Sequence, residues 1–317
     1  MQTIMAGEAT AAQIGALLVG LRMKGETAGE IAGAAEAMRA AATPVHTGRR
    51  PIVDTCGTGG DGRGTLNIST AAAIVAAGGG VTVAKHGNRA VSSRSGSADV
   101  LEALGVKIDL EARQLGRCLD EAGIAFLFAP VLHPAMRHAI GPRREIKIRT
   151  LFNVLGPLTN PAGAQRQVLG VFAPRLAPLL ARVLADLGCE HALVIHGAAG
   201  EDELSLSGEN LAIEMRAGED ALRSLPVRGA DLGLMAADED ALRGGDAAEN
   251  ARWLTRLLTG EEVGPSRETV ILNAAAAFYV AGVAADLAEG CARARESLDS
   301  GAAGRALALL RETSHRV

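Results

Sequence analysis

From residue 52 onwards, short apolar segments alternate with segments whose apolar residues recur at helical spacing. Strands are expected at 52–54, 81–84, 124–128, 167–171, 192–195 and 210–215. Helices are expected at 67–77, 97–104, 111–123, 176–187, 247–258, 267–281, 288–298 and 302–313. Because parallel strands are usually joined by helical crossovers, this alternation predicts an α/β fold with a mainly parallel central sheet, covered by helices on both faces.

The first 42 residues have a different pattern. They are rich in alanine, and Ile14, Leu17, Leu18 and Leu21 recur on one face of an expected helix. Three or four short helices fit into this segment. The following stretch, 43–51, is polar and contains two prolines, which predicts a linker.

Composition excludes several classes of function. A formal net charge of −4 argues against general affinity for nucleic acid or anionic membranes, and 2% aromatic residues leave few rings for stacking on bases. The four cysteines form no CxxC pair, so we expect reduced thiols rather than a zinc or redox site. The N-terminal residues predict an amphipathic helix rather than a signal peptide, and no apolar run reaches the roughly 18 residues of a membrane span. A cytoplasmic protein is expected.

A glycine-rich segment, DTCGTGGDGRGTLNIST at 54–70, connects an expected strand to an expected helix. Glycines allow consecutive backbone N–H groups to turn toward one anion, and the N-terminus of the following helix adds partial positive charge. Asn67 is the expected N-cap, and Ser69 and Thr70 add hydroxyl groups. The segment predicts a phosphate-binding loop, with a glycine-rich turn that binds nothing as the alternative.

Two common phosphate motifs do not describe this loop. Gly57, Gly59 and Gly62 match GxGxxG, but Lys85 follows the second strand where a dinucleotide site needs an acidic residue. Asp61 would also repel a bare pyrophosphate unless a metal ion or a ribose hydroxyl met it. A Walker A loop is excluded because Arg63 and Gly64 replace its Lys and Ser/Thr.

A second polar loop, KHGNRAVSSRSGSAD at 85–99, follows the second expected strand. It holds three cations, Lys85, Arg89 and Arg94, together with several hydroxyl groups. The carboxyl ends of parallel strands carry ligand sites in open sheets, so we expect this loop to bind an anionic group. Two such loops on neighbouring strands predict a ligand with phosphate at two ends.

Two further segments carry charge. Glu201, Asp202 and Glu203 follow a buried strand, and such carboxylates can hold Mg²⁺ against phosphates, although a solvated acidic turn is the alternative. The basic segment 133–150 can supply one arginine to a carboxylate substrate, whereas Arg149 is read as structural. The segment 151–161 is expected to contribute packing contacts rather than chemistry.

These segments together resemble anthranilate phosphoribosyltransferases. The resemblance covers about residues 50 to 282 and rests on GTGGD at 57–61, NxST at 67–70, KHGN at 85–88, SSRSGSADVLEALG at 92–105, RTLFNVLGPLTNP at 149–161, Asp202 with Glu203, and LNAAAAFYVAG at 272–282. It implies a Mg²⁺-dependent step of tryptophan biosynthesis. The amine of anthranilate attacks C1 of phosphoribosyl pyrophosphate, and pyrophosphate leaves.

The resemblance also implies an organisation and a partner. A small helical domain is hinged to a larger α/β domain, with the site between them, and the family usually forms a homodimer through the helical domain. In this chain the helical domain would comprise 1–45 plus about 108–143. The α/β domain would comprise about 50–107 plus 144–317. No nucleic acid or membrane partner is implied.

The family's functional residues are carried over by position. Those implied to hold phosphoribosyl pyrophosphate are Gly57, Gly60, Asp61, Thr65, Asn67, Ile68, Ser69, Thr70, Lys85, His86, Gly87, Asn88, Arg89, Ala90, Val91, Ser92, Ser93 and Ser97. Those implied to bind Mg²⁺ are Ser69, Asp202 and Glu203. Those implied to contact anthranilate are Gly57, Asn88, Arg143, His86 and His133, although a structural role for either histidine stays open. Lys85 and Asp61 are implied to be catalytic.

The chain departs from the family pattern at two places. Lys147 stands where the family tends to have glycine, and the segment 54–56 replaces a more usual apolar pair before the glycine-rich loop. Two alternatives remain: a pyrimidine nucleoside phosphorylase, which has the same fold, and a nucleic-acid-binding paralogue without anthranilate recognition.

Overall fold

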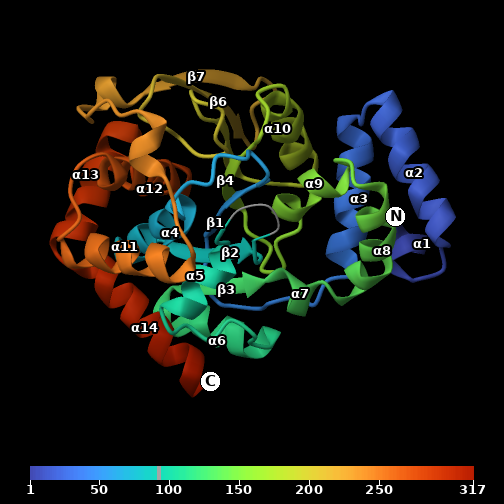
Figure 1. Ribbon diagram of the computed structural model, residues 1–317, viewed down its shortest axis with the longest axis horizontal. Coiled ribbons are helices and arrows are strands. Elements are labelled where there is room, and N and C mark those ends of the chain that lie inside the picture. The colour runs from blue at the N-terminus through green and yellow to red at the C-terminus, as the bar shows by residue number, and fades with distance from the viewer. Residues whose placement is uncertain (91–93) are drawn as a thin grey trace.

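A seven-stranded sheet forms the centre of the molecule, in the order β3-β2-β1-β4-β5-β6-β7. The computed structural model describes residues 1–90 and 94–317 (Figure 1). The parallel strands are β1 (Ile52–Gly57), β2 (Thr82–Gly87), β3 (Ile124–Phe128), β4 (Arg166–Gly170) and β5 (His191–His196). The strands β6 (Glu209–Arg216) and β7 (Arg223–Arg228) extend the sheet in antiparallel fashion. The predicted α/β fold class is confirmed.

Alternating side chains of the strands face two separate hydrophobic cores. Val168 and Leu193 pack into one core, whereas Leu169 and Val194, one residue later on the same strands, pack into the other. This is the two-residue period of a strand that is buried on both faces. The first core is covered by α4 (Ile68–Gly78), α5 (Ser97–Ala103), α6 (Ala112–Ala122), α11 (Ala247–Thr259), α12 (Pro265–Ala281), α13 (Leu287–Asp299) and α14 (Ala302–Arg316). The second is covered by α10 (Leu176–Asp186).

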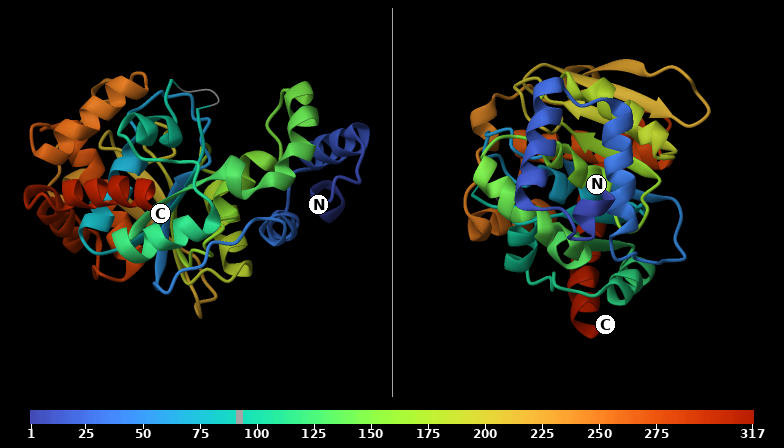
Figure 2. Two further views of the ribbon diagram at one scale, coloured as in Figure 1. Left: turned by 90° about the horizontal axis from the view of Figure 1, so that it is seen from below. Right: turned by 90° about the vertical axis from the view of Figure 1, so that its right-hand side faces the viewer.

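A helical part stands at one end of the molecule (Figure 2). It comprises α1 (Gln2–Met5), α2 (Ala11–Lys24), α3 (Ala28–Ala40) and α8 (Arg137–Ile146). The side chains of Thr10 and Thr27 cap α2 and α3 by accepting a hydrogen bond from the backbone of the third helical residue. Apolar residues of α2 and α3 join the second core beside α10, so the two parts share packed surface.

One predicted domain boundary is wrong. We expected the helical domain to include about 108–143, but α6 packs in the first core and β3 pairs with β2 over five residues. These elements belong to the α/β part because the apolar residues of β3 complete the edge of the sheet. The chain returns to the helical part only after α7 (Ala129–Leu132) and η1 (Pro134–Met136).

The remaining elements are short or exposed. They are α9 (Phe152–Leu155), η2 (Gly156–Leu158), η3 (Gly229–Leu232) and η4 (Glu239–Leu242). The strand β7 was not predicted, because only Val227 is buried in it and Pro226 interrupts the pattern. Within the described part of the chain, no helix combines the length and the apolar character needed to cross a lipid bilayer.

Candidate active site

A cavity of about 550 Å³ opens at the carboxyl ends of β1 and β2. Its walls come from the loops after these strands, from the segment 152–157, and from Arg143 on α8, so both parts of the molecule border it. The predicted site residues that line it are Gly57, Gly60, Asp61, Thr65, Asn67, Ser69, Thr70, Lys85, His86, Gly87, Asn88, Arg89, Ala90, Ser97, Arg143, Asp202 and Glu203. The structure therefore brings most of the predicted residues to one place.

A few predicted residues do not line the cavity. Ile68 is fully buried in the first turn of α4 and packs in the first core. His133 lies behind His86, with the two Nε2 atoms 3.2 Å apart. Val91, Ser92 and Ser93 lie outside the described residues.

The glycine-rich loop needs its glycines. Gly59, Gly60, Gly62 and Gly64 have φ between +64° and +76°, a region that other residues rarely adopt. At Gly57 the requirement is space, because a Cβ atom there would lie 2.1 Å from Asp202 Oδ2. Asp202 can therefore lie against the end of β1, where its Oδ2 accepts a hydrogen bond from the Gly59 N–H at 2.6 Å.

Two half-buried carboxylates, Asp202 and Glu203, lie beside Ser69. Glu203 Oε1 accepts a hydrogen bond from the Ser69 backbone N–H at 2.8 Å. Burial raises the pKa of both carboxyls, and negative neighbours raise it further: Asp61 acts on Asp202, and Asp202 acts on Glu203. Two half-buried carboxylates that repel each other favour a bound cation.

The donor set around Ser69 fits Mg²⁺. Each of the two carboxylates uses one oxygen for a backbone N–H, which leaves the other oxygen and the Ser69 hydroxyl as hard ligands. No group of three or more His, Cys, Asp or Glu side chains is placed to hold a metal ion within 1–90 and 94–317. Mg²⁺ commonly binds through one or two carboxylates and completes its shell with water and substrate phosphates, so this site suits a metal that arrives with a phosphorylated substrate.

Lys85 lies at the bottom of the cavity and is 3% exposed. It was predicted to begin a loop, but Lys85, His86 and Gly87 are residues of β2. Its Nζ donates hydrogen bonds to the Thr55 carbonyl and to Ser69 Oγ. Burial lowers the pKa of Lys85, whereas the surrounding carboxylates, Asp54 first, raise it. The ammonium group thus connects β1, β2 and the first turn of α4.

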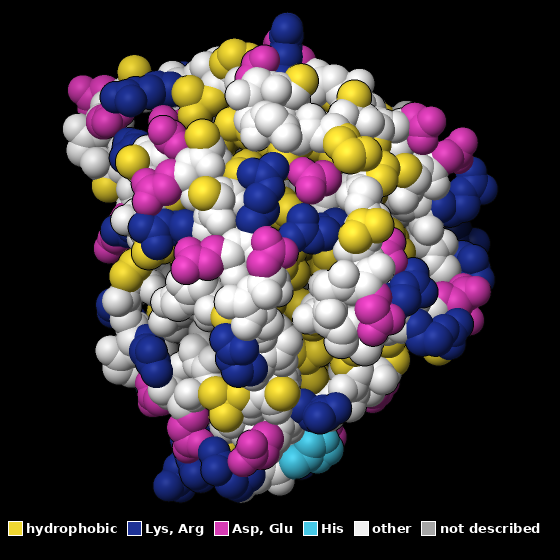
Figure 3. Space-filling view, turned by 90° about the vertical axis from the view of Figure 1, so that its left-hand side faces the viewer, with side chains coloured by type: hydrophobic (Ala, Val, Ile, Leu, Met, Phe, Trp, Pro, Cys, Tyr) yellow, Lys and Arg dark blue, Asp and Glu magenta, His cyan; other side chains and the backbone are white. Residues whose placement is uncertain are grey.

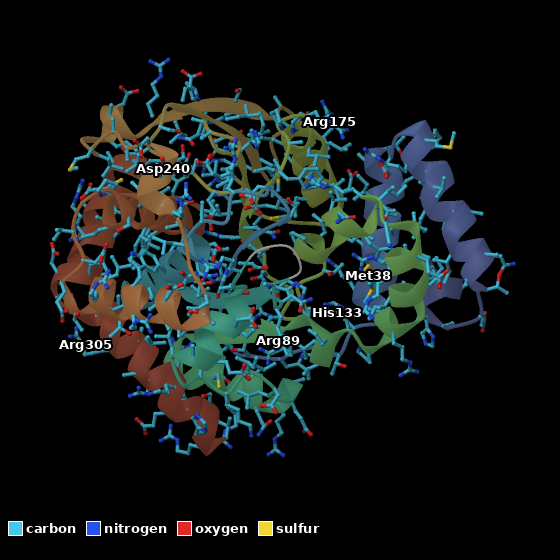
Figure 4. The ribbon with its side chains drawn as sticks, in the orientation of Figure 1. Met38, Arg89, His133, Arg175, Asp240 and Arg305 are labelled. Carbon is cyan, nitrogen blue, oxygen red and sulfur yellow. The ribbon has the colours of Figure 1, made fainter. Side chains whose placement is uncertain are left out.

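The second polar loop is less cationic than its sequence indicated. Arg89 forms ion pairs with Asp99 at 2.9 Å and Glu102 at 2.8 Å, both on α5, and its guanidinium lies over Phe128 of β3 (Figure 4). Asp99 also accepts hydrogen bonds from the N–H groups of Ala90 and Gly96. The carboxylates of α5 therefore hold the shape of this loop.

Arg143 approaches the cavity from the helical part. Its guanidinium lies 4.9 Å from the ring centre of Phe152, and burial lowers its pKa. Across 1–90 and 94–317 the structure gives this side chain no ion-pair partner. A partly buried guanidinium without a counter-ion is suited to bind a carboxylate.

His86 and His133 form a buried pair below the same wall. His86 Nδ1 lies 3.0 Å from the Gly156 carbonyl, which can only accept, so Nδ1 carries the hydrogen. In neutral His86, Nε2 then accepts from His133 Nε2–H. Burial lowers the pKa of His86 to about 3 and that of His133 to about 4. Both nitrogens of His86 are occupied within the protein; His133 lies at the junction with the helical part (Figure 4).

Several lining residues were not predicted. Arg149 donates a hydrogen bond to the Gly60 carbonyl and lies 4.1 Å from the ring centre of Phe172. Phe152, Asn153, Gly156 and Pro157 also line the cavity. These four residues belong to the segment 151–161, which we expected to contribute packing contacts only. Its prolines, glycines and apolar residues do not indicate a binding site.

Asn67 stands at the predicted N-cap position of α4, but its side chain does not cap the helix. Its Nδ2 donates to the Ser95 carbonyl at 3.2 Å, and its Oδ1 accepts from Asn250 Nδ2 at 2.8 Å. Asn67 therefore ties the glycine-rich loop to the second loop and to α11.

A larger cavity, of about 780 Å³, lies between α5, α11 and α14. Apolar side chains such as Leu104, Leu258 and Leu307 line it, with Arg252, Arg256 and Arg311 beside them; Figure 3 shows apolar and basic side chains together on this face. None of the predicted site residues lines it. The smaller cavity is therefore the candidate active site.

Comparison with known proteins agrees with this architecture. Residues 49–304 match the family described as "Glycosyl transferase family, a/b domain", and residues 1–42 match its helical bundle domain. Proteins named anthranilate phosphoribosyltransferase are 59% identical in Chloroflexus aurantiacus, over 96% of this chain and 89% of the relative, and 53% identical in Symbiobacterium thermophilum, over 100% and 92%.

Solved structures give the same result. The anthranilate phosphoribosyltransferase of Thermus thermophilus is 49% identical, with a TM-score of 0.94 over 99% of this chain and 93% of that one. The Saccharomyces cerevisiae enzyme in complex with PRPP and Mg is 29% identical, with a TM-score of 0.88 over 97% and 86%. The chain belongs to the anthranilate phosphoribosyltransferase family.

Proposed function

We propose that this protein transfers the 5-phosphoribosyl group from phosphoribosyl pyrophosphate to the amine of anthranilate, as a step of tryptophan biosynthesis. The observation that carries the proposal is that one cavity joins a glycine-rich anion loop, a half-buried acidic pair and Arg143, which has no ion-pair partner among the described residues. The loop suits the diphosphate, the acidic pair suits its metal ion, and Arg143 suits the carboxylate of the acceptor. Names of relatives at 53–59% identity, and a related structure in complex with PRPP and Mg, support the same reaction.

Phosphoribosyl pyrophosphate would bind along the two loops. The N–H groups of the glycine-rich loop and the N-terminus of α4 provide donors for phosphate oxygens. Thr65, Asn67, Ser69, Thr70 and Ser97 add polar side chains on the same cavity wall. We also assign Val91, Ser92 and Ser93 to this substrate, on the resemblance alone.

Mg²⁺ would be held by Ser69, Asp202 and Glu203. When bound, it neutralises the diphosphate and makes pyrophosphate a better leaving group. Lys85 orients Ser69 through its Nζ–Oγ hydrogen bond of 3.4 Å and offsets part of the negative charge of the acidic pair. Asp61, which faces the same cavity, is assigned to the bound phosphoribosyl pyrophosphate.

Anthranilate would bind with its carboxylate at Arg143 and its ring beside His86, Asn88 and Gly57. The ring of His86 is held by Gly156 and His133, so His86 forms a wall with a defined orientation and His133 supports it from behind. His133 therefore acts through His86 and has no place on the cavity surface.

The bond changes are those of a substitution at C1. The anthranilate nitrogen lone pair forms the new bond to C1, the C1–O bond to pyrophosphate breaks, and the nitrogen loses one proton. An aromatic amine is already a nucleophile, so alignment and charge stabilisation supply much of the rate. The helical part carries Arg143, so its movement against the α/β part would bring the acceptor into line and exclude water.

A fluorescence assay tests the proposal. We expect anthranilate fluorescence to fall when the protein is mixed with phosphoribosyl pyrophosphate and Mg²⁺, pyrophosphate to be released, and EDTA to stop both. A folded protein that leaves anthranilate unchanged would contradict the proposal. DNA binding that weakens steeply with salt would then favour the nucleic-acid-binding paralogue. Phosphorolysis of a pyrimidine nucleoside would favour the phosphorylase.

We also propose that the protein acts as a homodimer in the cytoplasm. All four cysteines are buried free thiols, as a reducing compartment favours. On the helical part, Leu17 and Met23 of α2 are 40% and 83% exposed, and Ile140 of α8 is 40% exposed. The helices α2 and α8 pack against each other, and large exposed apolar side chains on neighbouring helices favour an interface.

A further inference from the structure

The sheet opens between β1 and β2 on the side of the cavity. The two strands pair only at Ile52 with Thr82 and at Val53 with Val83. On its other edge β1 pairs with β4 as far as Gly57, and β2 pairs with β3 as far as Gly87. Both strands therefore continue for four residues without pairing to each other, and the two substrate loops start from this opening.

Side chains replace the missing backbone hydrogen bonds. The His86 N–H donates to Asp54 Oδ1 at 3.1 Å, the Ala84 carbonyl accepts from Asn160 Nδ2 at 2.8 Å, and the Thr55 carbonyl accepts from Lys85 Nζ. Buried backbone groups without partners are costly, so these side chains are what allows the strands to remain apart.

Asp54 is the centre of this arrangement. It is fully buried, and besides the His86 N–H it accepts hydrogen bonds from Asn160 Nδ2 at 2.7 Å and from Cys56 Sγ at 3.3 Å. Asn160 is held in turn by the Ala162 N–H, which donates to its Oδ1 at 2.9 Å. The Asp54 carboxylate thus connects β1, β2 and the segment 151–161, to which Asn160 belongs.

We propose that Asp54 is a positioning residue for phosphoribosyl transfer: with Asn160, it keeps the ends of β1 and β2 apart and sets the spacing between the glycine-rich loop and the loop after β2. The inference rests on the proposed function, because that spacing is the width of the phosphoribosyl pyrophosphate site. Asp54 does not line the cavity, so its effect is transmitted through His86, through the strand ends and through the negative charge that it places near Lys85, a charge that Asn160→Ala leaves in place.

Two variants test this role. Asp54→Asn offers a single oxygen, so either the His86 N–H or the Asn160 amide loses its acceptor. Asn160→Ala removes the donor to both Asp54 and the Ala84 carbonyl. We expect each variant to raise the Kd for phosphoribosyl pyrophosphate with Mg²⁺ by about tenfold or more, since small misplacements of binding groups have effects of this size. Calorimetry measures the Kd, and steady-state kinetics measures whether KM rises more than kcat falls.

Glu214→Gln is the matched control. Glu214 is a buried carboxylate on the same sheet, and it accepts hydrogen bonds from His191, Arg216 and Tyr279 away from the cavity. We expect all three variants to lower the melting temperature, because each removes buried hydrogen bonds. Glu214→Gln should leave the Kd for phosphoribosyl pyrophosphate unchanged.

Two outcomes would overturn the inference. The first is a Kd for phosphoribosyl pyrophosphate that stays within twofold of the unmodified protein in both Asp54→Asn and Asn160→Ala. The second is that Glu214→Gln raises this Kd as much as they do. If Asp54→Asn does not fold, Asn160→Ala decides by the same criterion. The proposed function fails separately, if the unmodified protein binds phosphoribosyl pyrophosphate but does not consume anthranilate.

Discussion

At the scale of single residues, pairing decides which cations near the cavity can bind a substrate. Arg89 is held by Asp99 and Glu102, Arg94 lies 3.5 Å from Glu249, and Arg149 donates to the Gly60 carbonyl. Arg143 has only the ring of Phe152 beside it in the part of the chain that the structure describes. The resemblance already implied Arg143 for anthranilate, and the structure gives the physical reason: of these four arginines, Arg143 is the one that no carboxylate or carbonyl of the described residues holds.

Arg143→Ala is therefore expected to weaken anthranilate binding selectively. A charge-assisted hydrogen bond contributes about 1.5 to 3 kcal/mol, so KM for anthranilate should rise roughly 10- to 100-fold. The Kd for phosphoribosyl pyrophosphate should stay within about twofold. The adjacent Arg144 is exposed, and Arg144→Ala is the control that should change neither value. Equal losses for both substrates in Arg143→Ala would refute the assigned role.

The acidic pair is expected to show opposite effects on activity and stability. Replacing Asp202 by Asn and Glu203 by Gln together should abolish Mg²⁺-dependent turnover. Because the folded protein raises both pKa values, the carboxyls cost stability once pH rises through those values, and this cost is absent at low pH.

Without Mg²⁺, the double variant should therefore exceed the unmodified protein in free energy of unfolding by about 1 to 3 kcal/mol at pH 8, and by less at pH 5. Urea unfolding at the two pH values measures this difference. A double variant that remains fully active would refute the metal assignment, and a stability difference that shrinks toward pH 8 would refute the charge argument.

At the scale of elements, the end of α8 carries a strained residue. Lys147 has φ +54° and is the one non-glycine residue with positive φ in the described part of the chain. It forms the left-handed C-cap of α8, the conformation that glycine adopts without steric cost. The departure from the family's glycine therefore has a physical consequence.

Lys147→Gly should stabilise the protein by about 1 kcal/mol and raise the melting temperature by roughly 2 to 4 °C. Lys107→Gly is the control, because Lys107 is exposed and its φ is not positive. That control should give no increase, since it only adds freedom to the unfolded chain. Thermal unfolding followed by circular dichroism measures both, and an equal or lower melting temperature in Lys147→Gly would contradict the strain.

At the scale of the whole molecule, the proposed dimer interface and the candidate active site lie mainly on different parts. The exposed apolar residues Leu17 and Ile140 lie on the helical part, whereas most residues of the cavity lie on the α/β part. An interface through the helical part would hold Arg143 at a defined place in each subunit.

The double variant Leu17→Glu with Ile140→Glu should therefore sediment as a monomer, whereas we expect the unmodified protein to sediment as a dimer. Charges placed in an apolar interface without partners oppose association. Leu309→Glu on α14 is the control, because Leu309 is 39% exposed but lies far along the chain from the helical part. A monomeric unmodified protein, or a dimer that survives the double variant, would contradict this interface.

The sequence alone determined the features that depend on neighbouring residues. Alternating strands and helices predicted the parallel sheet, and the glycines at 57–64 predicted an anion loop, because strand period, helix period and backbone freedom are local properties. The strand β7 could not be predicted in this way because its residues are mostly exposed. The 108–143 boundary, which the resemblance implied, failed because matching motifs do not say which core an element between them joins.

The tertiary structure alone decided what depends on distant residues. Gly57 meets Asp202, Arg89 meets Glu102, and Asp54 meets both His86 and Asn160 only after the chain has folded. Hydrogen bonds and ion pairs act over a few ångströms, so they depend on where strands end and separate, and no local pattern records those positions. Arg143 and the acidic pair could therefore be predicted from the sequence. The lack of an ion-pair partner for Arg143 among the described residues, the ion pairs of Arg89 and the opening between β1 and β2 required the fold.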